Sequence, residues 1–312
     1  MWLITGGLLL ALLAGLLMVG FYTRPLRRLG GAMKNFSHHD FCETHLPQEL
    51  AARPDEIGRV VETFNQMALR IKEQMCTLEQ NDQERREMLA NVSHDLRTPL
   101  ASLQGYLETL LMKEQSLSQE EKRNYLEIAA KQSVRLSKLV GKLFELAKLD
   151  SARAKLAPEP FLLPELVQDV VQKFELAAAK KQIALKTNFP GVPPLVRADI
   201  GLIERVLENL IENALHYTPS GGSISVTLTP SLRQVTLEVS DTGRGIEAQD
   251  LERIFERFFR AEKSRHDASD SAGLGLAIVK RILELHQSQI KVQSTPGQGT
   301  TFSFPLPLVH TA

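Results

Sequence analysis

Residues 3–22 form a run of twenty positions near the N-terminus without a charged side chain. As an α-helix this run would be about 30 Å long, which matches the hydrocarbon thickness of a bilayer. Arg24, Arg27 and Arg28 follow it directly, and such charges favour the cytoplasmic side of a membrane. The sequence therefore predicts a single-pass transmembrane helix over residues 3–22, with everything after Tyr22 in the cytoplasm.

A cleaved signal peptide is the competing interpretation of this run. Signal peptides begin with a positively charged region, whereas only Met1 and Trp2 precede the apolar residues here. The membrane anchor is therefore the better prediction. Because so little chain precedes it, we expect no extracellular sensing domain within this sequence.

The composition restricts the partners that the chain can bind. Its 37 Lys and Arg residues balance 37 Asp and Glu residues, so no overall basic field favours nucleic acid. Cys42 and Cys76 lie in unrelated segments and offer neither a disulfide framework nor metal-ligand spacing. This cysteine usage is typical of a reducing compartment.

Helical periodicity continues after the apolar run. A short amphipathic helix from Pro25 precedes a polar connector over residues 37–54, and a second helix begins near Asp55. Apolar residues of the second helix alternate at intervals of four and three: Ile57, Val61, Phe64, Ala68, Ile71, Met75 and Leu78. Such a heptad seam predicts packing against a partner helix, and hence a dimer.

A second apolar series begins at Leu89, eleven residues after Leu78, which is the step that a stutter produces in a coiled coil. After a polar turn at residues 113–117, Ser118 and Glu121 form a capping-box pattern that starts another helix, ending near Asp150. We expect that helix to bury Leu126, Ala129, Leu136, Leu139, Leu143 and Leu146. Two copies of this hairpin would make a four-helix bundle.

The pattern changes beyond a predicted linker at residues 157–160. Helices are predicted over residues 163–180, 200–215 and 274–286, and strands over residues 183–187, 195–197, 223–228, 235–240, 289–294 and 300–305. This grouping predicts an α+β sandwich in which helices cover one face of a sheet.

His94 lies on the helix face opposite the apolar residues Val92, Leu96 and Leu100. At about 100° per residue, its imidazole should point into solvent. An exposed imidazole is suited to attack phosphorus when a neighbouring carboxylate holds its tautomer and accepts its proton.

The neighbours of His94 fit that chemistry without proving it. Asp95 is adjacent, Thr98 lies one turn further along the same face, and Pro99 removes a backbone donor. Taken alone, these residues favour an ordinary surface histidine beside a structural proline. Segments far along the chain reverse that preference.

Amide and carboxylate side chains mark two candidate nucleotide-binding segments. Asn209 and Asn213 are four residues apart on a predicted helix, and their amide oxygens suit Mg²⁺ held mainly by phosphates. Asp241 ends a strand before Gly243 and Gly245, where its carboxylate can accept a hydrogen bond from an adenine amino group. Each segment also has an ordinary interpretation, as packing amides or as an Asp–Gly turn.

Glycines mark two further segments. Gly273 and Gly275 open a helix, where exposed N–H groups favour phosphate, and residues 295–302 form a glycine turn between strands. Their ordinary interpretations are a tight helix start and a plain hairpin. Residues 255–260 and the polar residues that follow predict a mobile flap over a nucleotide, although the phenylalanines there could serve only as packing anchors. The Walker pattern is absent from the sequence, which excludes a P-loop enzyme.

Together these segments resemble the histidine kinase family of two-component signalling. The resemblance rests on five boxes in that family's order: the H-box at residues 91–100, the N-box at 208–218, the G1 box at 241–246, the F-box at 255–260 and the G2 box at 273–278. Residues 24–76, with Pro25 and residues 55–58, resemble a HAMP signal relay. The resemblance implies a dimerisation and phosphotransfer hairpin at residues 81–150 and a Bergerat-type ATP-binding domain at residues 160–309.

The resemblance also implies roles for individual residues. His94 would be phosphorylated, Asp95 would be the orienting base, and Thr98 would position water to dephosphorylate a response regulator. Asn209 and Asn213 would hold Mg²⁺. The implied ATP contacts are Asn209, Asn213, His216, Tyr217, Asp241, Gly243, Gly245, Ile246, Phe255, Arg260, Gly273, Leu274, Gly275, Leu276 and Thr300.

Two positions depart from the family pattern. His216 stands where Lys or Arg is common, which would weaken a phosphate contact, and Ser271 stands where a further glycine is common, which could stiffen the flap.

The function expected from this resemblance is ATP-dependent autophosphorylation of His94, followed by transfer to an aspartate of a response regulator. The expected partners are a second copy of the chain, the cognate regulator and the bacterial inner membrane, without direct nucleic acid binding. A non-catalytic nucleotide-binding relay is the alternative, although the expected reactive side chains are present. A chaperone-type or mismatch-repair-type ATPase with the same fold is disfavoured by the apolar run, the heptads and the H-box.

Overall fold

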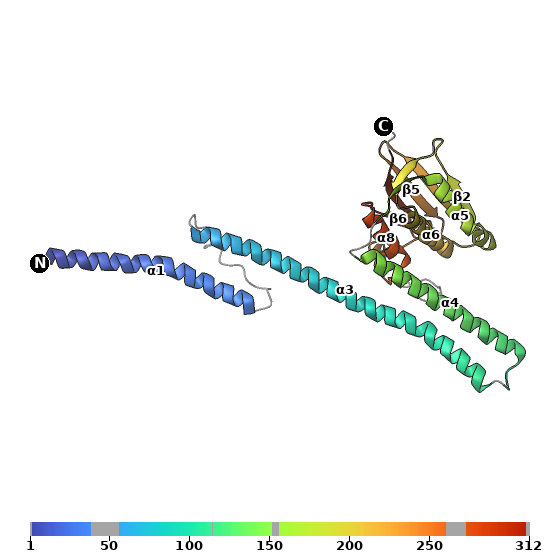
Figure 1. Ribbon diagram of the computed structural model, residues 1–312, viewed down its shortest axis with the longest axis horizontal. Helices are drawn as coiled ribbons and strands as arrows, with labels where there is room; N and C mark the ends of the chain where they lie inside the picture. Colours follow the sequence, from blue (N-terminus) through green and yellow to red (C-terminus); the bar gives the residue numbers. More distant parts are fainter. Residues whose placement is uncertain (1, 39–55, 114, 152–155, 260–272, 310–312) are drawn as a thin grey trace. The chain divides into compact units, whose positions relative to one another are not determined.

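The computed structural model describes residues 2–38, 56–113, 115–151, 156–259 and 273–309 (Figure 1). It contains two compact units, Met1–Glu87 and Met88–Ala312. Most of the predicted polar connector, Cys42, Arg260 and Ser271 lie outside the described residues.

The first unit is helical, with α1 (Trp2–His38) and the N-terminal part of α3 (Glu56–Met112). Its predicted heptad seam is confirmed over the first turns, where Val61, Phe64 and Ala68 are buried. The seam fades towards Leu78, whose side chain is 65% exposed. The predicted start of this helix near Asp55 agrees with the structure within one residue.

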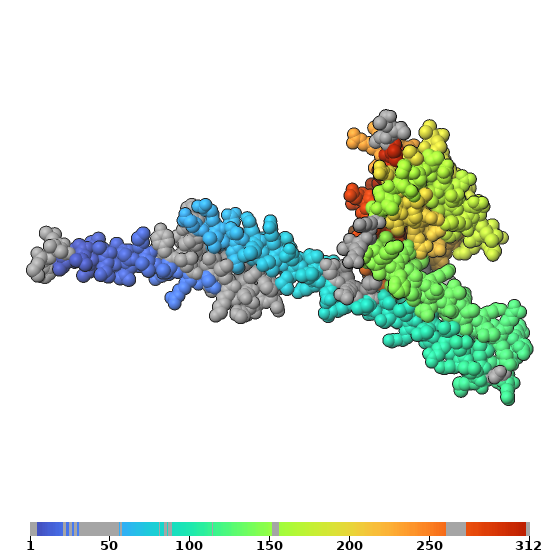
Figure 2. All heavy atoms as spheres, in the orientation of Figure 1, coloured from blue at the N-terminus to red at the C-terminus, as the bar shows by residue number. Residues whose placement is uncertain are grey.

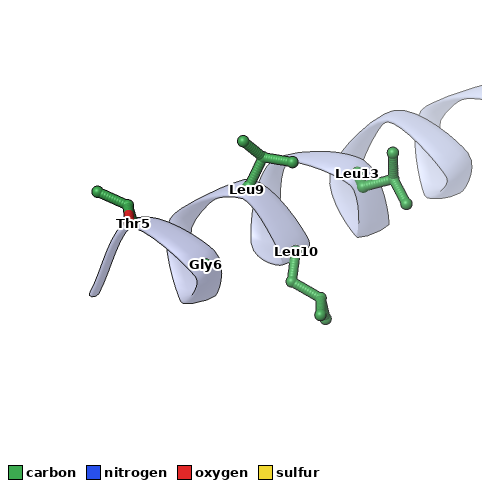
Figure 3. Close-up of a pocket in the computed structure, with 5 residues that line it drawn as sticks. All are labelled: Thr5, Gly6, Leu9, Leu10 and Leu13. Atoms are coloured by element: carbon green, nitrogen blue, oxygen red, sulfur yellow. The ribbon is translucent and has the colours of Figure 1, made fainter. Parts of the chain in front are cut away.

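The apolar run lies within α1, which continues past it through Arg24, Arg27 and Arg28 without a break. Thr5, Gly6, Leu9, Leu10 and Leu13 line a shallow groove on this one helix (Figure 3). Across the described parts of the chain, no helix combines the length and the apolar composition that a membrane crossing requires. The transmembrane helix predicted over residues 3–22 is therefore not shown.

The second unit begins with a helical hairpin formed by the C-terminal part of α3 and by α4 (Gln119–Asp150). Ser118 and Glu121 make the predicted capping box, in which the Glu121 N–H donates to Ser118 Oγ and the Ser118 N–H donates to the Glu121 carboxylate. This box satisfies N–H groups that the first helical turn leaves unpaired.

Burial along α4 agrees only in part with the sequence prediction. Ala129, Leu139 and Leu146 are buried as expected, and Leu136 and Leu143 are half-buried. Leu126 was expected in the core, yet its side chain is 55% exposed. A single hairpin supplies only two helices of a four-helix bundle, so it leaves this apolar face uncovered.

The remainder of the second unit is an α/β domain built on a five-stranded sheet in the order β2-β4-β5-β7-β6. The β2–β4 pair is parallel and the other pairs are antiparallel. The strands are β2 (Ala184–Asn188), β4 (Ser223–Pro230), β5 (Gln234–Asp241), β6 (Lys291–Thr295) and β7 (Gly299–Pro307).

Helices α5 (Leu163–Lys180), α6 (Ile200–Tyr217) and α8 (Gly275–Leu285) cover the sheet (Figure 1). Alternate residues of β4 and β5 are buried, as expected of strands with one face in a core. The space-filling view shows one outer face of this domain, coloured from green to red by residue number (Figure 2), and its core is formed by the buried residues of these strands and helices. The predicted α+β sandwich is confirmed.

The predicted linker at residues 157–160 is wrong in its second half. Strand β1 (Glu159–Leu162) includes Glu159 and Pro160, and it pairs antiparallel with β3 (Leu195–Ala198). Glutamate and proline are poor strand formers. The distant partner strand decides their conformation, and local sequence carries no sign of it. The sequence also gave no signal for the short 3₁₀ helix η1 (Ala248–Asp250).

Replacing Ser118 with alanine should loosen the first turn of α4. Loss of an N-cap side chain costs about 1 kcal/mol, so the Glu121 amide should exchange its hydrogen about fivefold faster. Hydrogen exchange measured by mass spectrometry on the full chain tests this, with the exposed mid-helix Ser137→Ala as the control. Equal exchange in the two variants would contradict the capping role.

Candidate nucleotide-binding and phosphoacceptor sites

The first cluster forms where α6 meets the start of α8. Asn209 is buried at 3% exposure, and its Nδ2 donates to the Arg205 carbonyl at 2.8 Å. Its Oδ1 is therefore directed towards Gly275, where an added Cβ would lie only 2.9 Å away. The Asn213 amide lies on the same side, 4.0 Å from that Cβ position. Both asparagines thus lie against the helix start where the sequence predicted phosphate binding.

Asp241 lies at the end of β5, where its carboxylate is pre-organised. The Gly243 N–H donates to Asp241 Oδ1 at 2.8 Å, and the Thr300 backbone on β7 also hydrogen-bonds to the carboxylate. Burial raises the pKa of Asp241, and these two donors oppose the rise. The carboxylate is therefore a half-buried acceptor, suited to an amino group on a ligand.

Two glycines near Asp241 have conformations that other residues rarely adopt. Gly245 has φ +70° and Gly299 has φ +113°. A Cβ at Gly245 would lie 2.2 Å from the Thr295 carbonyl oxygen, and one at Gly299 would lie 1.9 Å from that of Asp241. The glycines therefore allow the predicted G1 segment to pack directly against the β6–β7 turn.

Tyr217 forms part of a stack at the end of α6. The Arg244 guanidinium lies 4.4 Å from its ring centroid, and the His216 ring meets it edge-on at 4.6 Å. Cation–π packing of this kind holds the tyrosine ring in place. The sequence predicted His216 and Tyr217 as site residues but missed Arg244, whose role appears only when the G1 segment folds back onto α6.

The predicted F-box is hydrogen-bonded to the start of the predicted G2 box. The Phe258 N–H donates to the Gly273 carbonyl at 3.0 Å, and Phe255 packs edge-on against Phe302 at 6.3 Å. Leu274 is fully buried. The phenylalanines are thus packing anchors, one of the two interpretations of the sequence. The predicted flap itself, with Arg260, lies outside the described residues.

Leu276 and Ile246 complete the predicted set. Leu276 packs half-buried against the core from the first turn of α8, and the Ile246 N–H donates to Ser294 Oγ at 2.8 Å. Ser294 was not predicted, because nothing in its local sequence indicates this contact.

The second cluster lies on α3 in the helical hairpin. The His94 side chain is 81% exposed, and its Nδ1 lies 3.3 Å from Asp95 Oδ1. Thr98 Oγ1 donates to the His94 carbonyl at 3.2 Å, one turn further along the helix. α3 runs unbroken through Pro99. The predicted exposure of His94 and its pairing with Asp95 are confirmed.

A divalent cation would find amide ligands at the first cluster. Among the described residues, no group of three His, Cys, Asp or Glu side chains could hold a metal by itself. Asn209 Oδ1 is an oxygen ligand of the kind that Mg²⁺ takes beside phosphate oxygens, because magnesium takes few protein ligands in such sites. The Asn213 atom nearest to the same helix start is Nδ2, so Asn213 would turn its amide to present an oxygen to the ion.

The hairpin and the α/β domain are joined through the C-terminal part of α4. Arg205 on α6 makes a bidentate pair with Glu145, with contacts of 2.8 to 3.1 Å. Asp150, at the end of α4, pairs with Arg257 at 2.7 Å and with Arg281 at 3.3 Å. These contacts hold the end of the hairpin against the domain.

Three domain families match successive parts of the chain. A HAMP domain matches residues 18–73, and a His Kinase A (phospho-acceptor) domain matches residues 84–152. A histidine kinase-, DNA gyrase B- and HSP90-like ATPase domain matches residues 198–310. The last match supports ATP use by the α/β domain.

Characterised relatives align over most of the chain. The signal transduction histidine-protein kinase BaeS of Escherichia coli is 33% identical over 98% of this chain and 62% of its own length. The sensor protein IrlS of Burkholderia pseudomallei is 34% identical over 95% of this chain and 60% of its own. This chain spans between 34% and 62% of the length of such curated relatives.

Solved structures share the fold of 70–75% of this chain. Histidine kinase ThkA, in complex with the response regulator protein TrrA, matches with a TM-score of 0.60 at 25% identity, over 75% of this chain and 66% of its own. Acinetobacter baumannii histidine kinase AdeS matches with a TM-score of 0.56 at 25% identity, over 70% of this chain and 98% of its own.

Asp241→Asn should weaken nucleotide binding without lowering thermal stability. Because burial raises the pKa of Asp241, its ionised form is disfavoured in the folded state, and a neutral amide should keep or raise Tm at pH 7. That gain should shrink as the pH falls below the raised pKa, because both variants are then neutral at this position.

Asp241→Asn also replaces the carboxylate with an amide, which removes one charge-assisted hydrogen bond to the ligand. We therefore expect the affinity for MgADP to fall about tenfold or more. Thermal unfolding and titration calorimetry measure both effects, with the exposed Asp169→Asn on α5 as the control. A lower Tm with unchanged affinity would refute the assignment.

Proposed function

Because this chain belongs to the two-component sensor histidine kinase family, we propose that it phosphorylates its own His94 with ATP and passes the phosphoryl group to an aspartate of a response regulator. The observation that carries the proposal is an exposed histidine paired with a carboxylate, in the same chain as an ATPase-type domain. The alternative is a relay that binds nucleotide without chemistry, and the presence of these reactive groups disfavours it.

The pairing of His94 with Asp95 defines the nucleophile. With its Nδ1–H directed to the Asp95 carboxylate, the imidazole keeps the Nε2 lone pair for attack on the γ-phosphorus. The N–P bond forms as the bond from phosphorus to the β–γ bridging oxygen breaks, ADP leaves, and Asp95 accepts or stabilises the Nδ1 proton. A bound Mg²⁺ would neutralise charge on the phosphates.

Residues of the α/β domain would bind and orient the nucleotide. Asp241 would accept from the adenine amino group, while Asn209 and Asn213 would face the metal and the phosphates. Backbone N–H groups after Gly273 open α8 and favour phosphate. His216 lies beside the Tyr217 ring. Because a neutral imidazole carries no positive charge, it would contribute less to phosphate binding there than Lys or Arg would.

We further propose that the hairpin dephosphorylates the regulator. Thr98 lies one turn after His94, where its hydroxyl could hold a water in line with an aspartyl phosphate. The hydroxyl now donates to the His94 carbonyl, so it would have to rotate towards that water.

The proposed partners are a second copy of the chain and a response regulator. An apolar face with exposed Leu100, Leu107 and Leu126 supports dimerisation of the hairpin. The ThkA complex, in which a related kinase holds a regulator, supports the second partner.

Attachment to the bacterial inner membrane is the remaining part of the proposal, with a single pass and cytoplasmic catalytic domains. The uncharged run of residues 3–22 and the HAMP match support it.

His94→Gln should abolish phosphorylation while nucleotide binding persists. The cytoplasmic portion, incubated with Mg²⁺ and ATP labelled at the γ position, should acquire acid-labile, base-stable label only when His94 is present. Unchanged MgADP affinity in the variant is the control for folding. Label that survives the substitution, or a wild-type chain that takes up none, would refute the proposed kinase activity.

Thr98→Ala should retain autophosphorylation but slow dephosphorylation of the regulator about tenfold to a hundredfold, because a water loses its positioning group. Thr109→Ala is a matched control, since Thr109 Oγ1 makes the same back-bond to the Gly105 carbonyl on the same helix. Equal dephosphorylation rates for the two variants would reject the role of Thr98.

A further inference from the structure

The G1 segment, residues 241–246, is joined to the β6–β7 turn, residues 294–300. The Gly297 N–H donates to the Arg244 carbonyl at 2.7 Å, and Asp241 pairs with Thr300 in the β5–β7 ladder. Both of these joins are made by the backbone. The join at Ile246 differs, because a side chain makes it.

Ser294 on β6 makes that join through its hydroxyl group. Ser294 Oγ accepts from the Ile246 N–H at 2.8 Å, donates to the Gly299 carbonyl at 2.8 Å and lies 2.9 Å from Thr300 Oγ1. One small side chain therefore contacts the far end of the G1 segment and both residues at the start of β7.

The hydrogen-bond donors in this group fix the direction of the Thr300 hydroxyl. A serine hydroxyl has one proton, and here the Gly299 carbonyl takes it. The Ser294–Thr300 bond must then take its proton from Thr300. The hydroxyl of Thr300, a residue buried at 6% exposure, is left with acceptor capacity only. The Asp241 carboxylate, to which the Thr300 backbone N–H donates, also only accepts when ionised.

We infer that Ser294 is a positioning residue for base recognition. Its hydroxyl keeps the Thr300 hydroxyl, like the Asp241 carboxylate beside it, as a hydrogen-bond acceptor, and this pair of acceptors favours a 6-amino purine over a 6-oxo purine. This inference rests on the proposed function only in taking the pair as the base-binding site. An adenine amino group carries two N–H donors that two acceptors can share, whereas hypoxanthine offers only its single N1–H, next to an acceptor oxygen at the 6-position that such a pair repels. Discrimination by hydrogen-bond type is large where the site's polar groups are buried.

The test compares MgADP with MgIDP, which differ at the 6-position of the base. Titration calorimetry on the full chain measures both affinities for wild type, Ser294→Ala and Ser294→Thr. Ser303→Ala is the control, since Ser303 is a half-buried serine of the same sheet. We expect Ser294→Ala to lower the ADP-to-IDP affinity ratio about tenfold, the worth of one lost hydrogen-bond constraint.

The threonine variant keeps a hydroxyl and should retain the wild-type ratio, as should Ser303→Ala. Hydrogen exchange supplies a reading that does not depend on ligand, because the Ile246 amide should exchange faster in Ser294→Ala and at the wild-type rate in Ser294→Thr.

An unchanged ratio in Ser294→Ala, or an equal loss of ADP and IDP affinity, would overturn the inference, as would unchanged Ile246 exchange. Should Ser294→Ala fail to fold, a low ratio in a folded Ser294→Thr would overturn it equally. Because calorimetry reads binding alone, a wild-type chain that binds MgADP selectively yet leaves His94 unlabelled would refute the kinase activity and leave this inference standing.

Discussion

The close approach of α6 to the first turn of α8 is the contact on which the proposed nucleotide site depends. Gly275 makes it feasible, since any Cβ there would lie 2.9 Å from Asn209 Oδ1. The hydrogen bond from Asn209 Nδ2 to the Arg205 carbonyl orients the Asn209 amide, so Asn209 Oδ1 points towards Gly275. Because Gly275 has no side chain, the amides of Asn209 and Asn213 can lie against the N-terminus of α8.

Hydrophobic burial, more than charge, joins the hairpin to the α/β domain. The ion pairs of Glu145 and Asp150 are partly exposed, and such pairs contribute about 0–1 kcal/mol each. Leu146 and Leu149, almost fully buried in the same core cluster, contribute about 1.5–3 kcal/mol each. The leucines stabilise the contact, and the bidentate Arg205–Glu145 geometry sets its register.

Much of the fold was predictable because its signals are local. The span of α5 agrees with the predicted helix, and α4 begins at the predicted capping box, since periodicity and caps act within a few residues. Strand β1 was missed because its partner residues lie 33 to 39 positions further along the chain. Leu126 is exposed in the single chain because periodicity identifies an apolar face but does not supply the neighbour that covers it.

The sequence by itself determined the chemical parts: an exposed His94 next to Asp95, two asparagines one turn apart, and the glycines of the predicted G1 and G2 boxes. Tertiary structure alone decided how those parts are held. Arg244 stacks on Tyr217, and Ser294 accepts from Ile246, across separations of 27 and 48 residues. A hydrogen bond or a stack depends on positions in space, and residues so far apart in sequence meet only once the sheet has formed.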